Sequence, residues 1–278
     1  MELATMDLTA AQTLVELFAN VDVFMAVFVR VMGFFIILPI TSGQSLPLQG
    51  RIVLAVSIAL LAFVSGAVQL PAYEFSIVGF MMFMVTEFLV GLVIGMIVMI
   101  IFSIFQFVGQ LTDFSIGFRI VDVMDPFSMQ QMPVTGQLYF FTASIFFLTS
   151  GAFHMVLRAF FDSFSIIGLG QGQVIGNANL AGRVIDMMIS YFHLGLRMAL
   201  PIVGTLLTID IVLGILVKAI PNMNVFVVGM PLKVMVGLVI IYFIMPFIIT
   251  AFGIVMDDIM NNVIEVIWRM APNETYSP

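Results

Sequence analysis

The chain alternates long apolar stretches with short polar segments. The apolar stretches predict helices over residues 11–38, 52–68, 138–161 and 232–255. Several of them reach the roughly 20 residues that a helix needs to cross the hydrocarbon core of a bilayer. No stretch alternates apolar and polar residues with a period of two, which favours a bundle of helices over a barrel. The pattern therefore predicts an all-α integral membrane protein.

The stretch at residues 75–111 is too long for a single crossing. It is apolar throughout, with Glu87 as its only charged residue. As one straight helix it would measure about 55 Å, against a hydrocarbon core of about 30 Å. Either the chain turns back near Gly91 and Gly95, or a long helix leaves the bilayer inside a protein assembly.

A second overlong stretch covers residues 184–220. We expect a break there at Pro201 and Gly204, because proline removes a backbone hydrogen bond from a helix and glycine destabilises the middle of a helix. A loop at 221–231, with a proline at each end, is predicted to be a shaped connection between packed helices. The residues that follow the last apolar stretch, 256–270, form an amphipathic tail.

Composition supports the membrane assignment and excludes other classes. Hydrophobic residues make up 62% of the chain and charged residues 9%, whereas a soluble domain carries about 25% charged residues. A net charge of −7 argues against a nucleic-acid partner. The chain has no cysteine, and its two histidines, His154 and His193, lack the spacing of a metal site. Both histidines are interpreted as hydrogen-bonding groups between helices, and no cofactor is predicted.

Glu87 is followed at helical spacing by Gly91 and Gly95. Small residues at this spacing let two membrane helices approach closely, and an ionisable group at membrane depth needs a partner, a cavity or a proton path. We interpret the three residues as a helix-packing face or subunit interface, with Glu87 hydrogen-bonded across it. A direct role in transport is the alternative.

The segment 108-VGQLTDFSIGFRIVDVMDP-126 concentrates polarity between two apolar stretches. Its charged side chains are Asp113, Arg119, Asp122 and Asp125. Gly109 and Gly117 permit tight turns, and nonhelical backbone at membrane depth is tolerated only against protein or a watery cavity. The segment is therefore either an ordinary solvent-exposed loop or an element that projects into a cavity.

The glycine- and asparagine-rich segment 168–182 superficially resembles a nucleotide-binding turn. It contains neither a G-x-G-x-x-G nor a Walker motif, and no strand precedes it. We interpret it as a flexible connector. Because no G-x-S-x-G motif occurs and nothing pairs a serine with either histidine, no enzymatic activity is predicted.

Five stretches of the chain occur in an order that is shared with a known family. They are the EFLVG stretch from Glu87 to Gly91, 109-GQLTDFSIGF-118, the Asp125-Pro126 step, 151-GAFH-154 and 221-PNMNVFVVGMPLKVMVGL-238. In this order they resemble the FliR family of flagellar export-gate subunits and its relatives in type III secretion injectisomes. With length and hydropathy, the resemblance extends over nearly the whole chain.

The resemblance implies a non-enzymatic subunit of a protein export gate in the bacterial inner membrane, at the flagellar basal body. FliP-like and FliQ-like subunits are the partners that it implies, together with FlhB- and FlhA-like export components. The chain would help to form and plug a channel for unfolded flagellar proteins, in contact with membrane lipid. Residues 1–183 would correspond to a FliP-like part that contains the pore loop, and 184–278 to a FliQ-like helical hairpin with the amphipathic tail.

The resemblance also implies roles for individual residues. The residues that it assigns to a pore loop or plug are Gly109, Gln110, Asp113, Phe114, Gly117, Phe118, Arg119, Asp122, Asp125 and Pro126. The residues assigned to helix packing or a subunit interface are Glu87, Gly91, Gly95, Pro221, Asn224, Phe226, Gly229, Pro231 and Lys233. The alternatives are an injectisome gate subunit and a secondary transporter of a small solute, the latter because of helix breaks expected at Pro201 and Pro246.

Overall fold

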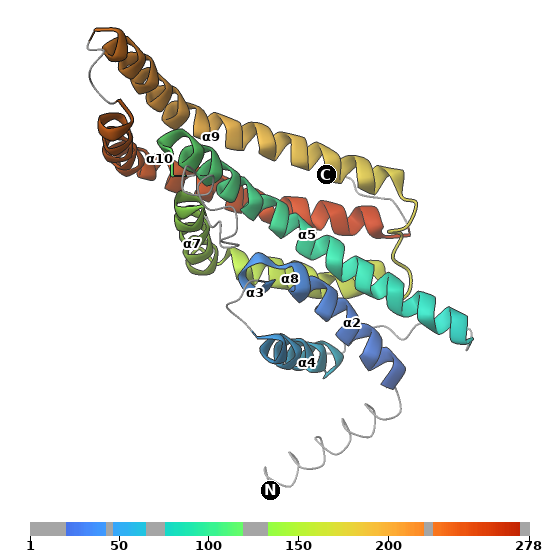
Figure 1. Ribbon diagram of the computed structural model, residues 1–278. Coiled ribbons are helices and arrows are strands. Elements are labelled where there is room, and N and C mark those ends of the chain that lie inside the picture. The colour runs from blue at the N-terminus through green and yellow to red at the C-terminus, as the bar shows by residue number, and fades with distance from the viewer. Residues whose placement is uncertain (1–20, 43–46, 65–75, 119–132, 220–224, 273–278) are drawn as a thin grey trace, which may run out of the picture. The chain divides into compact units, whose positions relative to one another are not determined.

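The computed structural model describes residues 21–42, 47–64, 76–118, 133–219 and 225–272. Within these ranges every regular element is a helix (Figure 1). The helices are α2 (Val21–Ile37), α3 (Pro39–Ser42), α4 (Leu48–Val64), α5 (Ile77–Ile116), α7 (Val134–Thr149), α8 (Ala152–Ile167), α9 (Ala178–Ala219) and α10 (Val225–Met270). The predicted all-α fold is confirmed.

Three of the described helices, α5, α9 and α10, are long and apolar enough to cross a membrane. A fourth crossing results if α7 and α8 are counted together as one interrupted span. This arrangement identifies an integral membrane protein. The three long helices have 40, 42 and 46 residues, so each is roughly 60 to 70 Å long at 1.5 Å per residue.

The chain forms two compact units, each made of separate stretches of sequence. Unit 1 contains residues 1–99, 153–185 and 259–278, and unit 2 contains residues 100–152 and 186–258. Helices α5, α9 and α10 each contribute to both units. The division at residue 183 concerns likeness to two partner proteins rather than packing, and it stays a prediction.

Helix α5 decides between the two alternatives for residues 75–111. It is one continuous helix through Gly91 and Gly95 to Ile116, so the chain does not turn back there. The stretch expected as one span at 138–161 is not one continuous helix, because the helical run is interrupted at Ser150 and Gly151. Gly151 has φ of 80°, a left-handed conformation that ends a helix and that glycine adopts at little cost.

The break expected at Pro201 and Gly204 is also wrong, since α9 runs through both residues. Proline leaves a backbone carbonyl in the preceding turn without its usual donor, and in membrane helices such carbonyls find other partners, including Ser and Thr hydroxyls. The carbonyl that loses its donor here is that of Arg197, four residues before Pro201. The hydroxyl of Thr205 donates to the carbonyl of Pro201 at 2.7 Å, which is the usual contact of a threonine with the preceding helical turn. Helix α10 likewise passes through Pro231 and Pro246.

Aromatic side chains fill much of the core in each unit. In unit 1, the rings of Phe34 and Phe160 stack with their centroids 4.7 Å apart. In unit 2, Phe105 meets Phe252 edge to face at 4.0 Å between centroids. Large rings bury much apolar area and pack with defined geometry, so these contacts hold together segments that are distant in sequence.

Candidate functional site

Helices α2 and α5 approach closely where α5 carries glycine. A Cβ atom added to Gly91 would overlap the backbone carbonyl of Arg30, and one added to Gly95 would lie 2.7 Å from the carbonyl oxygen of Phe34. Only glycine leaves room for these backbones to touch. Gly91 and Gly95 therefore lie at a helix contact inside the chain itself.

The close approach brings two opposite charges together in the core of unit 1. The Nε atom of Arg30 donates to Oε2 of Glu87 at 2.5 Å, and Nη2 donates to Oε1 at 3.1 Å. Both side chains are 0% exposed. A buried charge is costly unless it is paired and hydrogen-bonded, so the two-point contact with Arg30 is what allows both side chains to be buried.

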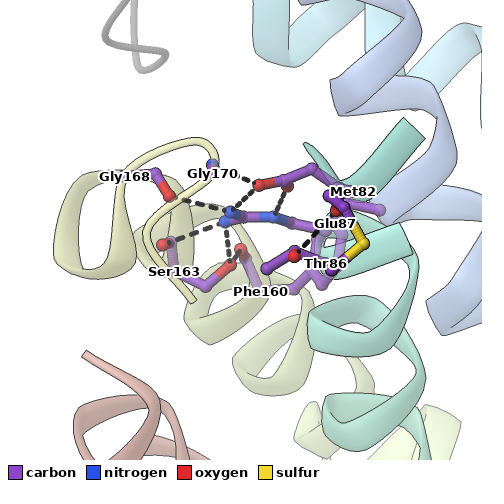
Figure 2. A network of polar contacts seen from close by, with 8 residues as sticks. Met82, Thr86, Glu87, Phe160, Ser163, Gly168 and Gly170 are labelled. Carbon is purple, nitrogen blue, oxygen red and sulfur yellow. Dashed lines mark hydrogen bonds and ion pairs between the residues drawn. The ribbon is translucent and has the colours of Figure 1, made fainter. Parts of the chain in front are cut away.

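The remaining hydrogen bonds of the pair reach the end of α8 and the loop that follows it (Figure 2). Arg30 donates from Nη1 to the carbonyl of Ser163 at 3.1 Å and from Nη2 to that of Gly168 at 3.2 Å. The backbone N–H of Gly170 donates to Oε1 of Glu87 at 2.7 Å. We call these residues, Arg30, Glu87, Ser163, Gly168 and Gly170, the Arg30 network. It joins α2, α5, α8 and the loop at one point.

Two glycines give the loop the geometry that the Arg30 network needs. Gly168 and Gly170 have φ of 60° and 76°, which residues with a side chain rarely adopt. The loop is also anchored further on, where the N–H of Gln173 donates to the carbonyl of Met270 at 2.9 Å. The connector expected over 168–182 is wrong in part, because residues 178–182 belong to α9 and the preceding backbone has specific partners.

Sequence reasoning did not identify Arg30 as a site residue. A signal was present, since an arginine inside an apolar helix must find an acceptor. Glu87 is the only acidic residue in the apolar stretch 75–111, so it was the obvious candidate.

In unit 2, Asp113 links the end of α5 to the start of α7. Its carboxylate is buried and accepts the backbone N–H of Thr135 at 3.0 Å to both oxygens, and that of Gly136 at 3.5 Å. The first N–H groups of a helix have no partner within the helix, and its N-terminus attracts negative charge. Asp113 therefore caps α7 from a neighbouring helix.

The loop expected from Gly109 onward is wrong for residues 109–116, which belong to α5. Gly109 is not a hinge: a Cβ atom there would overlap the backbone of Gly136, so the residue permits α5 and α7 to touch. Gly117 does make a turn, with φ of 94°, and its N–H donates to the carbonyl of Asp113 at 3.1 Å. This is a glycine-terminated helix end.

The other residues assigned to a pore loop fall into two groups. Gln110 and Phe114 are exposed on α5, and Phe118 is half-buried beside the turn. Arg119, Asp122, Asp125 and Pro126 lie outside the described residues. Because Asp113 joins α5 to α7, the described residues on either side of the segment 119–132 are held near each other.

The expected loop at 221–231 is shorter than predicted, because α10 begins at Val225 and includes Phe226, Gly229 and Pro231. Pro221 and Asn224 lie outside the described residues. Lys233, which is also in α10, binds Asp210 of α9, with Nζ 2.7 Å from Oδ1 and 2.8 Å from Oδ2.

The two histidines do not lie buried between helices as expected, since the side chains of His154 and His193 are exposed. Among the described residues no group of three or more His, Cys, Asp or Glu side chains could hold a metal ion.

Comparison with known proteins identifies the family. The family model for bacterial export proteins, family 1, matches residues 21–259. The chain is similar to the flagellar biosynthetic protein FliR of Bacillus subtilis (strain 168), with 32% identity over 217 residues that cover 78% of this chain and 83% of that protein. It is also similar to the proteins of that name from Escherichia coli (strain K12) and Aquifex aeolicus (strain VF5). The Escherichia coli protein is 28% identical, over 86% of this chain and 90% of the relative. The Aquifex aeolicus protein is 27% identical, over 79% of this chain and 83% of the relative. The membrane fold, the family match and these relatives agree that the chain belongs to the bacterial export proteins, family 1.

Proposed function

We propose that this protein is a subunit of the flagellar protein export gate, where it helps to form and to plug the channel for unfolded flagellar proteins. The observation that carries the proposal is the family match over most of the chain, together with relatives that bear a flagellar name. That name favours the flagellar apparatus over an injectisome. The gate would lie in the inner membrane at the flagellar basal body.

The long helices support an assembly of several proteins. Helices α5, α9 and α10 are each about twice as long as the hydrocarbon core is thick. Lipid alone cannot cover them along their whole length, so neighbouring proteins would cover the rest. We propose FliP-like and FliQ-like subunits as these neighbours, with FlhB- and FlhA-like components also in contact. Residues 1–183 would correspond to the FliP-like part and residues 184–278 to the FliQ-like hairpin.

We assign the plug to the residues that follow Gly117, rather than to the whole of 109–126. Asp113 and Gly109 hold α5 against α7, so the described residues on both sides of the assigned plug are fixed relative to each other. No enzymatic step is proposed for the chain. The energy for export would come from other subunits.

Two measurements test the proposal. The affinity-tagged chain, extracted from membranes in mild detergent, should copurify with FliP-like and FliQ-like proteins. A variant that lacks residues 119–126 should still copurify with them and should make the membrane leaky to ions, as read by loss of membrane potential in cells that express the complex. Replacing the same residues by glycine and serine retains the length and shows whether chain length or side chains make the seal. A tight membrane around an intact complex of the deletion variant would contradict the plug.

A further inference from the structure

The end of α10 forms part of the core of unit 1. This end, residues 259–270, is called here the clasp, and it belongs to the stretch predicted as an amphipathic tail. Its apolar side is fully buried and consists of Ile259, Val263, Val266, Ile267 and Met270. These positions follow the helical repeat, so they lie on one face of the helix. Unit 1 is therefore incomplete without a stretch of chain that is translated after the whole of 186–258.

Polar side chains join the clasp to the start of α9. Arg183 donates from Nη2 to Oδ1 of Asn262 at 3.0 Å, and the same nitrogen lies 2.7 Å from Oε2 of Glu265. The other carboxylate oxygen of Glu265 accepts from Arg269, one turn further along α10, at 2.9 Å. Figure 1 shows this end of α10 beside the start of α9. One carboxylate therefore bridges two guanidinium groups, one from each helix.

The loop 168–177 supplies hydrogen bonds to the last carbonyls of the clasp. The last four carbonyls of a helix have no donor within that helix. The N–H of Gln173 donates to the carbonyl of Met270 at 2.9 Å, and Nδ2 of Asn177 donates to that of Arg269 at 2.8 Å. Oδ1 of Asn177 accepts the N–H of Leu180 at 2.9 Å, which caps the start of α9. One amide side chain therefore serves the end of α10 and the start of α9.

The opposite end of this loop belongs to the Arg30 network. The carbonyl of Gly168 accepts from Arg30, and the N–H of Gly170 donates to Glu87. The loop contains no helix or strand, and four of its ten residues are glycine. Glycine loses more conformational freedom on folding than any other residue, so the loop is costly to order. Each anchor lowers that cost for the other, because a loop already fixed at one end has less freedom left to lose.

We propose that the loop 168–177 is a strap that couples the clasp to the Arg30 network, so that the loop closes on the network only when the clasp is bound. Two contacts that share one ordering cost are cooperative even when they do not touch each other. A chain therefore closes unit 1 only after residues 259–270 have been translated. The inference does not rest on the proposed function, since every contact that carries it lies within unit 1.

Thiol labelling of Leu169→Cys measures whether the loop is closed. Leu169 lies between the two glycines of the Arg30 network and is 3% exposed. The chain has no cysteine, so the substitution gives a single thiol. A buried thiol reacts slowly with N-ethylmaleimide, because the reaction needs an accessible thiolate. The full chain is labelled in membranes of cells that express it, and Ala143→Cys, fully buried in unit 2, reports separately on the folding of that unit.

A change of one amide to a carboxylate removes the clasp contact and retains the helix cap. Asn177→Asp keeps the acceptor for the N–H of Leu180, since aspartate caps a helix as well as asparagine does, but it loses the donor to the carbonyl of Arg269. Leu169→Cys should then react about fivefold faster, the size expected for the loss of one hydrogen bond. Asn261→Asp makes the same change on the exposed side of the clasp and should leave the rate unchanged.

A displaced clasp gives a stronger test. Two alanines inserted between Asp258 and Ile259 turn the clasp by about 200° about the helix axis, so its apolar side no longer faces unit 1. Leu169→Cys should then react about tenfold faster, whereas two alanines inserted after Pro272 should leave the rate unchanged. Ala143→Cys should react slowly with both insertions. If it reacts fast, the insertion has unfolded unit 2 as well, and the comparison of Asn177→Asp with Asn261→Asp decides.

The coupling also acts in the reverse direction, because a coupling free energy is the same from either side. Val263→Cys places a thiol on the fully buried side of the clasp. In the variant Arg30→Met/Glu87→Leu, which lacks the charged groups of the network, this thiol should react about tenfold faster. Ala59→Cys, fully buried in α4 of the same unit, is the control and should react slowly in that variant.

Three outcomes would overturn the inference. The first is slow labelling of Leu169→Cys both in Asn177→Asp and in the insertion before Ile259, which would show that the loop closes without the clasp. The second is equal acceleration by Asn177→Asp and Asn261→Asp. The third is an unchanged rate at Val263→Cys when the Arg30 network is removed, which would show that the two anchors are independent.

Discussion

The Arg30–Glu87 pair makes the sharpest prediction about stability. Replacing Glu87 by leucine removes the carboxylate and leaves the guanidinium of Arg30 fully buried, with only backbone carbonyls and a serine hydroxyl as acceptors. Breaking one side of a buried pair costs about 3–5 kcal/mol, because the other charge is left uncompensated. Arg30→Met leaves Glu87 with the single N–H of Gly170 as donor, so a loss of similar size is expected.

The double variant Arg30→Met/Glu87→Leu should lose less than the sum of the two single variants, and no more than either one. Its remaining cost is the unmade hydrogen bond of Gly170, about 1–3 kcal/mol if that N–H stays buried. Replacing a whole buried pair by apolar side chains is often close to neutral, since both desolvation penalties disappear together. The coupling between the two sites should therefore amount to several kcal/mol.

Thermal unfolding of the purified protein in detergent measures these differences. In a chain of 150–250 residues, 1 kcal/mol shifts the midpoint by roughly 2–4 °C, so each single variant should lose roughly 6–20 °C and the double variant clearly less. The reasoning would be refuted if the single losses added up in the double variant, or if Glu87→Leu unfolded at the temperature of the unmodified protein. Either result would mean that the two charges are not coupled in the folded state.

Three further predictions concern the contacts of α7 and the glycines, with thermal unfolding as the measurement. Asp113→Ala should lower the free energy of unfolding by about 1–3 kcal/mol, because two N–H groups at the start of α7 lose their acceptor. Asp113→Asn keeps one acceptor oxygen and should therefore lose less. An equal loss in the two variants would speak against the cap. Gly109→Ala should cost about 1–3 kcal/mol through overlap with α7, whereas Gly214→Ala, in open space, should be neutral or stabilising by up to about 1 kcal/mol. Gly151→Ala should cost about 1–2 kcal/mol, since alanine at φ of 80° is strained; an unchanged midpoint would disprove that strain.

Local patterns predicted some element boundaries well and others poorly. The long helix α5 was one of two alternatives, because nothing within 75–111 can show whether glycines at 91 and 95 turn the chain or pack against a neighbour. The structure places α2 against them, and the helix continues. The same ambiguity misled the prediction at Gly109, which packs against Gly136 instead of making a turn. A glycine permits both outcomes, and only the neighbouring element selects one.

The candidate sites were predictable to a similar degree. Glu87 could be identified, since a carboxylate in a long apolar stretch needs a partner. Its partner Arg30 lies 57 positions away in sequence, and the glycine backbone that completes the network lies in a loop that sequence reasoning treated as a connector. Asp113 was singled out for its charge, but its role as a cap for α7 depends on a helix that begins 21 residues later.

The sequence by itself determined that the chain is an all-α membrane protein, because 62% hydrophobic residues cannot form a soluble surface and their long runs satisfy backbone hydrogen bonds as helices. It also determined the family, since the five stretches that carry the resemblance occur in the same order along the sequence and can be recognised without knowledge of the packing. Only the tertiary structure decided which charges are paired, which glycines are contacts and which prolines leave a helix intact. The charge pairs and the glycine contacts depend on atoms from distant parts of the chain, which no local pattern reveals.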